Sequence, residues 1–324
     1  MRRAVASTLV EIAGSDPRVL LMTADLGFMV WEEFSEAYPS RFFNVGVAEA
    51  NMMGLATGLA ACGYVPFVYS IATFASMRGY EQIRNGPILH NLPVRILGVG
   101  GGFEYGQAGF THHALEDLGI ARIQPGLTVI APADHAQAVA ALRATYNLPG
   151  PIYYRIGKND NYVLPGLEGR FRLGRLETVT EGSDILILTL GSISEEAVKA
   201  AEKFAGNGIS AAVSLVSSLR PAPKEDLHEL LVRFPVALTV EEHYVDGGLG
   251  TMVSEVAAEY GTRCRLVRCG VKSMPSSYGS ESFLRNAEGL TGEDIYRAGL
   301  AALSGQKNEC LTAHLGYTPR LSTS

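Results

Sequence analysis

The stretch "FFNVGVAEANMMGLATGLAACGYVPFVYSIATFASM" covers residues 42–77 and contains one charged residue, Glu49. The uncharged run after Glu49 is long enough to cross a bilayer, but Gly63 and Pro66 divide it. Polar side chains also interrupt the run, at Asn51, Thr57, Ser70 and Thr73. This pattern predicts a buried helix followed by a buried strand instead of a membrane span.

On both sides of this stretch, short apolar runs alternate with helical patterns. The runs end in Gly, Asp or small residues, as strands often do, and lie at 18–25, 64–70, 94–100, 127–133 and 151–157. Helices are expected at 48–62, 74–90 and 134–147, with Asp134 as the N-cap of the last one. The N-terminal segment predicts an amphipathic helix as well, because Val5, Leu9 and Ile12 recur at helical spacing.

A turn-rich segment, "NDNYVLPGLEGRFRLGR" at 159–175, breaks this rhythm before a second series begins. Further strands are expected at 184–192, 210–218, 236–243 and 264–270, and helices at 195–207, 224–233 and 250–260. Such alternation indicates an α/β fold, in which a mostly parallel sheet is flanked by helices. We expect two such domains, at 1–165 and 178–305, with a linker at 166–177 and a polar tail at 306–324.

Composition narrows the classes of function. The chain has 324 residues, with 33 acidic against 27 basic side chains and a net charge of -6. Without a basic run, this balance argues against a nucleic-acid partner or an anionic membrane and favours small or polar metabolites. The four cysteines form no C-x-x-C pair and have no His at metal spacing, so neither a disulfide framework nor a zinc site is predicted. A cytoplasmic location is expected.

Glu49 lies at the start of the helix expected at 48–62, and two roles are open for it. A carboxylate near a helix N-terminus interacts favourably with the helix macrodipole, which is a structural role. The second role is chemical, because the preceding "VGVA" is small enough for close backbone approach. The helix also carries small residues suited to packing against another subunit, namely Gly54, Ala56, Gly58 and Ala60. One acid in such surroundings is typical of a site at a subunit interface.

Several segments together resemble the pyrimidine-binding domain of transketolases and of the related deoxyxylulose-phosphate synthases. They are "ADLG" (24–27), the segment 42–68, "ATFASMRGYEQIRN" (72–85) and "GQAGFTHHALEDLGIARIQPGLTVIAPAD" (106–134). Two later segments, "LGSISEEAVKAA" (190–201) and "VEEHYVDGGLG" (240–250), are similar to the C-terminal domain of the same family. The resemblance covers almost the whole chain in order, and it implies this fold and a thiamine diphosphate enzyme.

The same resemblance implies a partner subunit. Family members bind thiamine diphosphate and Mg²⁺ through a separate diphosphate-binding domain that carries a G-D-G segment, and no G-D-G occurs here. The chain therefore resembles the C-terminal subunit of a split transketolase. The resemblance implies that the metal ligands lie on a separately encoded N-terminal subunit, in an α2β2 assembly with two sites.

The loop "GVGGGF" at 98–103 raises a different possibility, a dinucleotide site. It fails the G-x-G-x-x-G pattern, because Phe103 stands in place of the last Gly. We expect the loop to line a ligand cleft at the carboxyl end of a strand.

The resemblance assigns roles to five residues. Glu49 matches the acid that hydrogen-bonds N1′ of the cofactor, so that the 4′-imino group can remove the thiazolium C2 proton. Phe74 matches the ring that stacks on the pyrimidine, and Ile71 stands where some relatives have a second aromatic residue. His112 matches a histidine that hydrogen-bonds substrate hydroxyls. Asp25, at a strand end, is expected either to contact the cofactor or to cap a helix or loop.

Other positions depart from the family pattern. Gly100 replaces a second substrate histidine, and Ala108 replaces an aspartate that contacts the C2 hydroxyl of the substrate. Met29 replaces a phosphate-binding Ser and Lys158 a phosphate-binding Arg, whereas Arg2 is retained. These changes predict a roomier, more apolar substrate site, and a donor or acceptor other than the common pentose phosphates.

Three functions are open at this point. The leading expectation is a two-component transketolase-like enzyme that transfers a two-carbon ketol or acyl unit. The second is the matching subunit of a 2-oxo-acid decarboxylating dehydrogenase, although "NVGVAEANMMG" (44–54) and "THHALED" (111–117) favour transketolase. The third is a non-catalytic subunit that only stabilises its partner, against which Glu49 and Phe74 argue.

Overall fold

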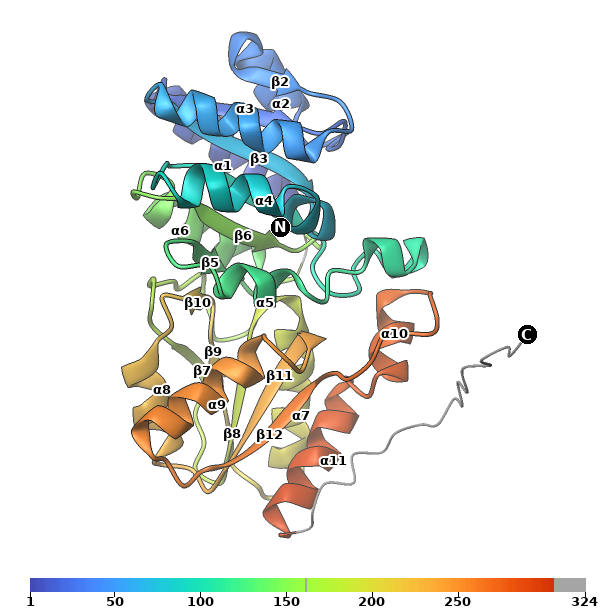
Figure 1. Cartoon of the computed structure of the whole chain (residues 1–324). Coiled ribbons are helices and arrows are strands. Elements are labelled where there is room, and N and C mark those ends of the chain that lie inside the picture. The colour runs from blue at the N-terminus through green and yellow to red at the C-terminus, as the bar shows by residue number, and fades with distance from the viewer. Residues whose placement is uncertain (161, 306–324) are drawn as a thin grey trace, which may run out of the picture.

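The chain builds two sheets, one above the other in Figure 1. The structure is a computed structural model that describes residues 1–160 and 162–305, so the tail expected at 306–324 lies outside the described residues. Both halves have the predicted α/β architecture, with mostly parallel strands between layers of helices.

The first sheet has seven strands in the order β10-β5-β6-β4-β3-β1-β2. Neighbours are parallel except for β10, which pairs antiparallel with β5. The strands are β1 (Val19–Thr23), β2 (Phe42–Asn44), β3 (Val65–Ile71), β4 (Arg95–Val99), β5 (Thr128–Ile130), β6 (Ile152–Ile156) and β10 (Ser218–Arg220). The five strands predicted in this half are confirmed, whereas β2 and β10 were not predicted.

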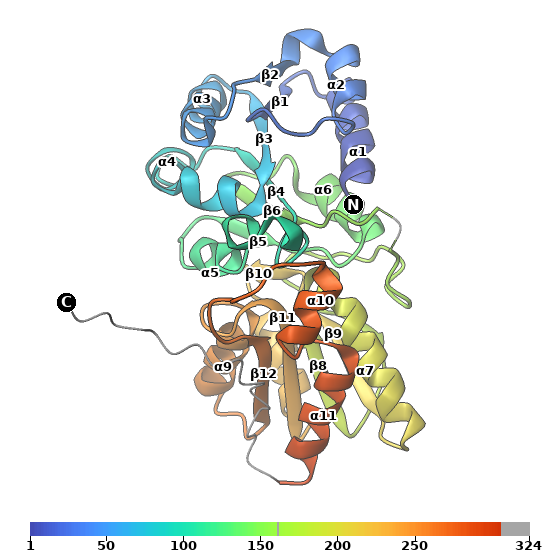
Figure 2. The ribbon, with the colours of Figure 1, turned by 90° about the vertical axis from the view of Figure 1, so that its right-hand side faces the viewer.

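Helices cover both faces of the first sheet (Figure 2). One face carries α1 (Arg2–Ser15) and α6 (His135–Thr145). The other face carries α3 (Glu49–Ala61), α4 (Tyr80–Ile83) and α5 (Asp117–Arg122), and α2 (Glu32–Ala37) lies in the connection from β1 to β2. The predicted first helix is confirmed, because Val5, Leu9 and Ile12 are all buried in the core under α1.

The stretch 42–77 forms β2, α3 and β3, so the predicted helix and the strand that follows it are confirmed. Every residue of β3 is buried. Among the residues that the structure describes, no helix is long and apolar enough to cross a membrane.

The segment expected to form one helix at 74–90 is interrupted. The short helix α4 lies between two π-helical turns, Phe74–Arg78 and Arg84–Ile88. Such wide turns are rare and occur frequently at functional sites. The first of them directly follows the carboxyl end of β3, on the side of the sheet covered by α3.

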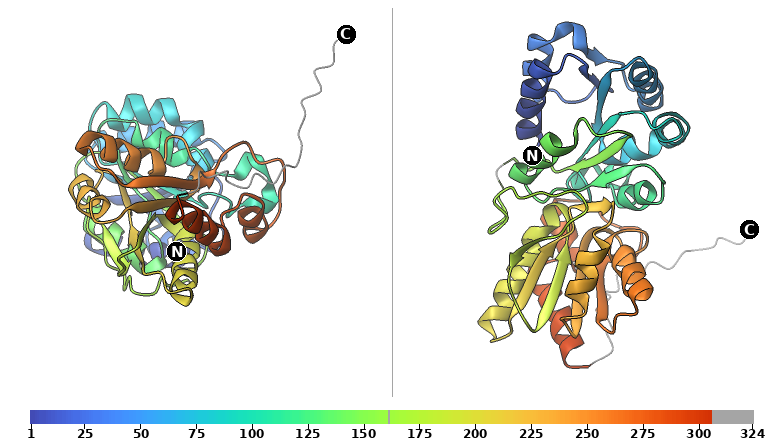
Figure 3. Two further views of the ribbon diagram at one scale, coloured as in Figure 1. Left: turned by 90° about the horizontal axis from the view of Figure 1, so that it is seen from below. Right: turned by 90° about the vertical axis from the view of Figure 1, so that its left-hand side faces the viewer.

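The second sheet has five strands in the order β12-β11-β8-β9-β7, all parallel except β7. They are β7 (Glu177–Thr180), β8 (Ile185–Thr189), β9 (Ala211–Leu215), β11 (Val236–Tyr244) and β12 (Arg265–Val271). One face carries α7 (Ser194–Gly206) and α11 (Gly292–Leu303), and the other carries α8 (Lys224–Leu231) and α9 (Leu249–Tyr260) (Figure 3). A further helix, α10 (Glu281–Ala287), lies beside the loop that precedes α5 (Figure 1). The strands and helices predicted in this half are confirmed, whereas β7, α10 and α11 were not predicted.

Short 3-10 helices complete the described elements, at Pro39–Arg41, Gly106–Ala108, Phe110–His112 and Gly191–Ile193.

Backbone pairing and a shared core join the two halves. Strand β10 comes from the second half of the sequence but extends the first sheet, with Ser218 opposite Ile130. One apolar cluster runs through both halves, from Met52 under α3 to Val253 under α9. The two halves therefore share an apolar core, although each has its own sheet.

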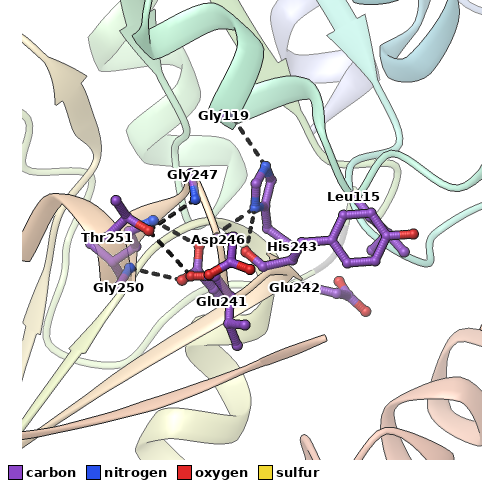
Figure 4. Close-up of polar contacts among 12 residues, drawn as sticks. Leu115, Gly119, Glu241, Glu242, His243, Asp246, Gly247, Gly250 and Thr251 are labelled. Atoms are coloured by element: carbon purple, nitrogen blue, oxygen red, sulfur yellow. Dashed lines mark hydrogen bonds and ion pairs between the residues drawn. The ribbon is translucent and has the colours of Figure 1, made fainter. Parts of the chain in front are cut away.

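The segment "VEEHYVDGGLG" adds polar contacts across this junction (Figure 4). His243 Nε2 accepts a hydrogen bond from the backbone N–H of Gly119 at 3.1 Å, and His243 Nδ1 donates to the Tyr244 carbonyl at 2.7 Å. These partners assign the neutral tautomer with its proton on Nδ1. Glu241 accepts from the N–H groups of Leu249 and Gly250 at 2.7 and 2.8 Å, which satisfies the N-terminus of α9.

We predict that His243 makes stability pH-dependent. Burial lowers the pKa of His243, and the neutral ring is the form that accepts from Gly119. The contribution of His243 to the free energy of unfolding is therefore complete above the pKa of an unfolded histidine, about 6.5. It is lost as the pH falls from that value toward the lower pKa of the folded state, by at most about 1.4 kcal/mol per pH unit. Urea unfolding at pH 7.5 and 5.5 should show this loss in the wild type and less of it in His243→Gln.

The control for this prediction is His90→Gln, which changes an exposed histidine and should keep the wild-type pH dependence. The informative quantity is the difference in acid destabilisation between His243→Gln and the wild type, because Glu241 also titrates in this pH range. Burial raises the pKa of Glu241 to about 7. The Glu241 carboxyl changes stability in the opposite direction, because its stabilising effect is lost as the pH rises through its pKa in the folded state. An equal acid loss in His243→Gln and wild type would contradict the assignment to His243.

Candidate active site

Glu49 is the first residue of α3 and is almost fully buried, with 3% of its surface exposed. Its Oε1 accepts a hydrogen bond from Ser70 Oγ at 3.1 Å. Ser70 lies near the carboxyl end of β3, so a central strand and a helix N-terminus fix the carboxylate from two sides. Ligand sites of parallel α/β sheets lie at this end of the strands.

Arg78 is the main partner of this carboxylate. Its Nη1 lies 3.0 Å from both Oε1 and Oε2 of Glu49. Its guanidinium carbon also lies 3.6 Å from the centroid of the Phe74 ring, which is close cation–π contact. The π-helical turn Phe74–Arg78 holds both the ring and the guanidinium. The Arg78 side chain remains 44% exposed, so this pair lies at the mouth of the site.

Phe74 also contacts His112. Their ring centroids lie 5.0 Å apart in an edge-to-face arrangement. Thr111 Oγ1 lies 2.9 Å from His112 Nδ1, which leaves Nε2 for another partner. The loop that carries His112 rests on the second half, because Gly279 N–H donates to the Gly106 carbonyl at 3.3 Å. The structure thus brings the predicted residues together, because Arg78 joins Glu49 to Phe74 and the Phe74 ring contacts His112.

His113, next to His112, is 2% exposed and packs edge-on against Phe103, with ring centroids 5.2 Å apart. These contacts are those of a core residue. Ile71, the last residue of β3, is also buried in the core.

Tyr105 extends this row of rings toward Lys158. Its ring centroid lies 6.3 Å from that of His112, and Lys158 Nζ lies 4.0 Å from the Tyr105 centroid. Gly100 adopts a φ of +77°, and a Cβ there would lie 2.1 Å from the Tyr105 ring. The expectation of extra room at Gly100 is therefore wrong, because Tyr105 fills the space.

Arg2 and Lys158 share a cationic region beside Tyr105. Burial, and then the nearby charge of Arg2, lower the pKa of Lys158. Within the described residues, Arg2 Nε is buried without a hydrogen-bond partner. Lys158 Nζ donates to the Glu104 carbonyl at 2.9 Å, so its side chain is held in place. The two cations fit the predicted contact with an anionic end of a substrate.

The remaining predicted residues lie in two exposed loops. Asp25 has a φ of +56° and accepts from Asn44 Nδ2 at 3.0 Å, so its hydrogen bonds link the ends of β1 and β2. Met29 has a φ of +63° and is 67% exposed. Ala108 is exposed in the loop before His112. The structure does not bring these three side chains into contact with Glu49 within the described residues.

Two family models match the chain over most of its length. The "Transketolase, pyrimidine binding domain" matches residues 1–162, and the "Transketolase, C-terminal domain" matches residues 174–295. The chain belongs to the transketolase family.

Full-length relatives of similar size also match this transketolase chain. It is 34% identical over 298 residues to a "Putative transketolase C-terminal section" of Methanocaldococcus jannaschii, which covers 91% of this chain and 93% of that protein. It is 35% identical over 299 residues to a "6-deoxy-6-sulfo-D-fructose transketolase subunit SqwH" of Clostridium sp., which covers 92% of each. A solved "Split gene transketolase, inactive beta4 tetramer" superposes with a TM-score of 0.86 and 35% identity, covering 94% of this chain and 99% of that one.

Membership of the transketolase family implies that thiamine diphosphate is the cofactor. The residues around Glu49 fit the pyrimidine ring of this cofactor. In the structure Glu49 and Phe74 together hold a flat group that donates hydrogen bonds, the guanidinium of Arg78. An aminopyrimidine ring is also flat and can share a proton with a carboxylate. Within residues 1–160 and 162–305, no group of three or more His, Cys, Asp or Glu side chains is placed to hold a metal ion.

The contacts of Ser70, Arg78 and Tyr105 in this transketolase site were not predicted. Arg78 carried a usable signal, because residues four apart in a helical segment lie on the same side and Phe74 was already a candidate. The signal for Tyr105 was weaker and consisted only of its position just after the glycine-rich loop 98–103, which was expected to line a ligand cleft.

Proposed function

We propose that this chain is the catalytic subunit of a two-component, thiamine diphosphate-dependent transketolase-like enzyme. The enzyme transfers a two-carbon ketol or acyl unit from a donor to an acceptor. The observation that carries the proposal is the buried carboxylate of Glu49 at the start of α3, which shares the guanidinium of Arg78 with the face of the Phe74 ring. When bound, the cofactor would supply a nucleophilic carbon and a thiazolium ring that acts as the electron sink.

The residues of this chain then have separate tasks. Glu49 shares a proton with N1′ of the pyrimidine, and Ser70 holds the carboxylate in position. Phe74 supports the flat face of the ring. His112 donates to or accepts from a substrate oxygen, since only its Nδ1 is engaged by Thr111. Lys158 and Arg2 attract the anionic end of the substrate.

A partner subunit would complete the site. Large apolar side chains are exposed within residues 42–77, at Phe43, Val47, Leu55 and Met77. A partner that packs on this part of the chain would remove these side chains from water. We propose that the partner carries the diphosphate-binding domain and the Mg²⁺ ligands, in an α2β2 assembly in the cytoplasm. Within this chain, residues 1–165 would bind the pyrimidine, 166–177 would be a linker and 178–305 would form the C-terminal domain.

This proposal predicts that the chain alone binds thiamine diphosphate weakly and does not catalyse. The diphosphate and Mg²⁺ contribute much of the affinity, and their ligands lie on the partner. Calorimetry with Mg²⁺ should give no tight binding to the isolated chain and tight binding after the partner is added. Tight Mg²⁺-dependent binding by the isolated chain would overturn the two-component proposal.

The substrate is predicted to differ from the common pentose phosphates. Two polar groups of the family site are replaced by Gly100 and Ala108, and Tyr105 places an apolar ring beside Gly100. The relative from Clostridium sp. is named for 6-deoxy-6-sulfo-D-fructose, which supports a donor of another kind. Each missing hydrogen bond costs about 0.5–1.5 kcal/mol, so two lower kcat/KM for xylulose 5-phosphate by roughly 5- to 150-fold.

The measurement is kcat/KM of the assembled enzyme for xylulose 5-phosphate with ribose 5-phosphate, compared with pyruvate and non-phosphorylated ketoses. Ala108→Asp restores one polar group at an exposed position and should improve xylulose 5-phosphate use roughly 2- to 12-fold, the value of one such bond. If the wild type already uses the pentose phosphates as efficiently as central metabolism requires, these replacements do not control the substrate.

A further inference from the structure

We propose that Arg78 is an internal ligand of the candidate cofactor site: in the partner-free chain its guanidinium occupies the place of the pyrimidine, and it must leave before the cofactor binds. This inference rests on the proposed function and adds a competitor for the same site. The competitor belongs to this chain, so its effect can be measured without the partner.

The contacts of Arg78 are the first argument. Its Nη1 lies 3.0 Å from each Glu49 oxygen, and its guanidinium carbon lies 3.6 Å from the Phe74 centroid. Ser70 takes a further position on Oε1 at 3.1 Å. The guanidinium therefore uses the outward side of the carboxylate and the open face of the ring at once. A pyrimidine that bonds to Glu49 and stacks on Phe74 needs both of these surfaces.

Burial gives the reason for such a competitor. Without Arg78, the Glu49 carboxylate would lie buried beside α3 with Ser70 as its remaining side-chain partner, and an uncompensated buried charge is costly. Arg78 neutralises this charge while the cofactor is absent. The guanidinium also covers one face of Phe74, an apolar ring next to solvent.

The position of Arg78 allows it to leave without a change of fold. Its side chain is 44% exposed and extends from the rim of the site, so rotation about its own bonds takes the guanidinium into solvent. Glu81 lies three residues further along, is exposed, and offers a carboxylate on the outside. Glu49, Ser70 and Phe74 can keep their positions during this change.

Competition of this kind has a measurable size. The apparent affinity of a ligand falls by the fraction of protein in which its site is open. If Arg78 leaves the site open in about a tenth of the molecules or fewer, its removal strengthens binding by about 10-fold or more. A residue that instead helps to bind the pyrimidine would give the opposite change.

The test uses the full chain without its partner and 4-amino-5-hydroxymethyl-2-methylpyrimidine, the ring half of the cofactor, with binding followed by NMR titration. Arg78→Ala should bind this probe about 10-fold more tightly than the wild type or better. Arg78→Lys keeps the charge for Glu49 but removes the flat stacking group, so it should show a smaller gain. If Arg78→Ala does not fold, the affinity of Arg78→Lys for the probe tests the proposal instead. Arg84→Ala is the matched control, since Arg84 is exposed and bonds to Asn85.

Each outcome separates the two proposals. Tighter binding in the Arg78 variants, with Arg84→Ala like wild type, supports the internal ligand. Equal or weaker binding in the Arg78 variants than in a binding wild type overturns it and leaves the proposed function standing. If neither the wild type nor any folded Arg78 variant binds the probe, the internal-ligand proposal falls, whereas the proposed function stands, because it expects tight binding only after the partner is added.

Discussion

Glu49→Gln is expected to lower kcat of the assembled enzyme by about 100-fold or more, while the fold and cofactor binding are retained. Glutamine has the same length and can still accept from Ser70, but its amide cannot share a proton with N1′. Proton transfer by a positioned side chain contributes roughly 100- to 10,000-fold to a rate, which sets the size of the loss. Steady-state turnover with the partner present measures it.

Two other variants make the result specific to Glu49. Glu202→Gln changes an exposed carboxylate in α7 and should leave turnover unchanged. Phe74→Ala removes the stacking ring and should first raise the cofactor concentration needed for half-maximal activity. Near-normal turnover in Glu49→Gln would remove this chain from the chemistry.

Arg285→Met is expected to destabilise the chain by about 3–5 kcal/mol, the usual cost when one partner of a buried ion pair is removed. Arg285 lies in α10 and is 8% exposed, and Glu242 in β11 is 2% exposed. Arg285 Nε and Nη2 lie 3.0 and 3.2 Å from the two Glu242 oxygens, and Nη2 also pairs with Glu281. Methionine would fill the space but leave these acids without their cation. Urea unfolding at neutral pH measures the loss.

The matched control is Arg297→Met in α11. Arg297 pairs with Glu293 one helical turn away, at 2.8 Å, and both side chains are substantially exposed. Exposed pairs contribute about 0–1 kcal/mol, so this variant should unfold close to wild type. Similar losses in the two variants would mean that burial of the Arg285–Glu242 pair has no special effect.

The architecture was predictable because strands that are covered by helices on both faces appear in the sequence as nearly continuous apolar runs. β3 and β8 are buried at every position, and both were predicted from their short apolar runs. β10 was missed for the opposite reason: Ser218–Arg220 is short and mostly polar, and its pairing with β5 depends on a distant part of the chain. β2 was missed because Phe42–Asn44 is equally short and largely exposed.

The candidate site was predictable where a family motif marked a residue, and less so where a contact depends on side-chain packing. Glu49, Phe74 and His112 lie together as the resemblance implied, although their roles are still proposals. Arg78 could not be assigned to Glu49 from local pattern, since the two are 29 residues apart. Gly100 misled the prediction in another way. A missing side chain predicts space, but a neighbouring ring such as Tyr105 can fill it.

The contribution of β10 to the first sheet also affects how the chain folds during its synthesis. A ribosome releases β5 well before Ser218–Arg220, and until then the outer edge of β5 exposes backbone groups that have no neighbour on that side. Such an open edge can pair with the edge of another nascent chain, which is a common start of aggregation. Completion of the first sheet therefore waits for the second half. The molecule has two sheets, but its N-terminal half reaches its full sheet only when most of the polypeptide has been synthesised.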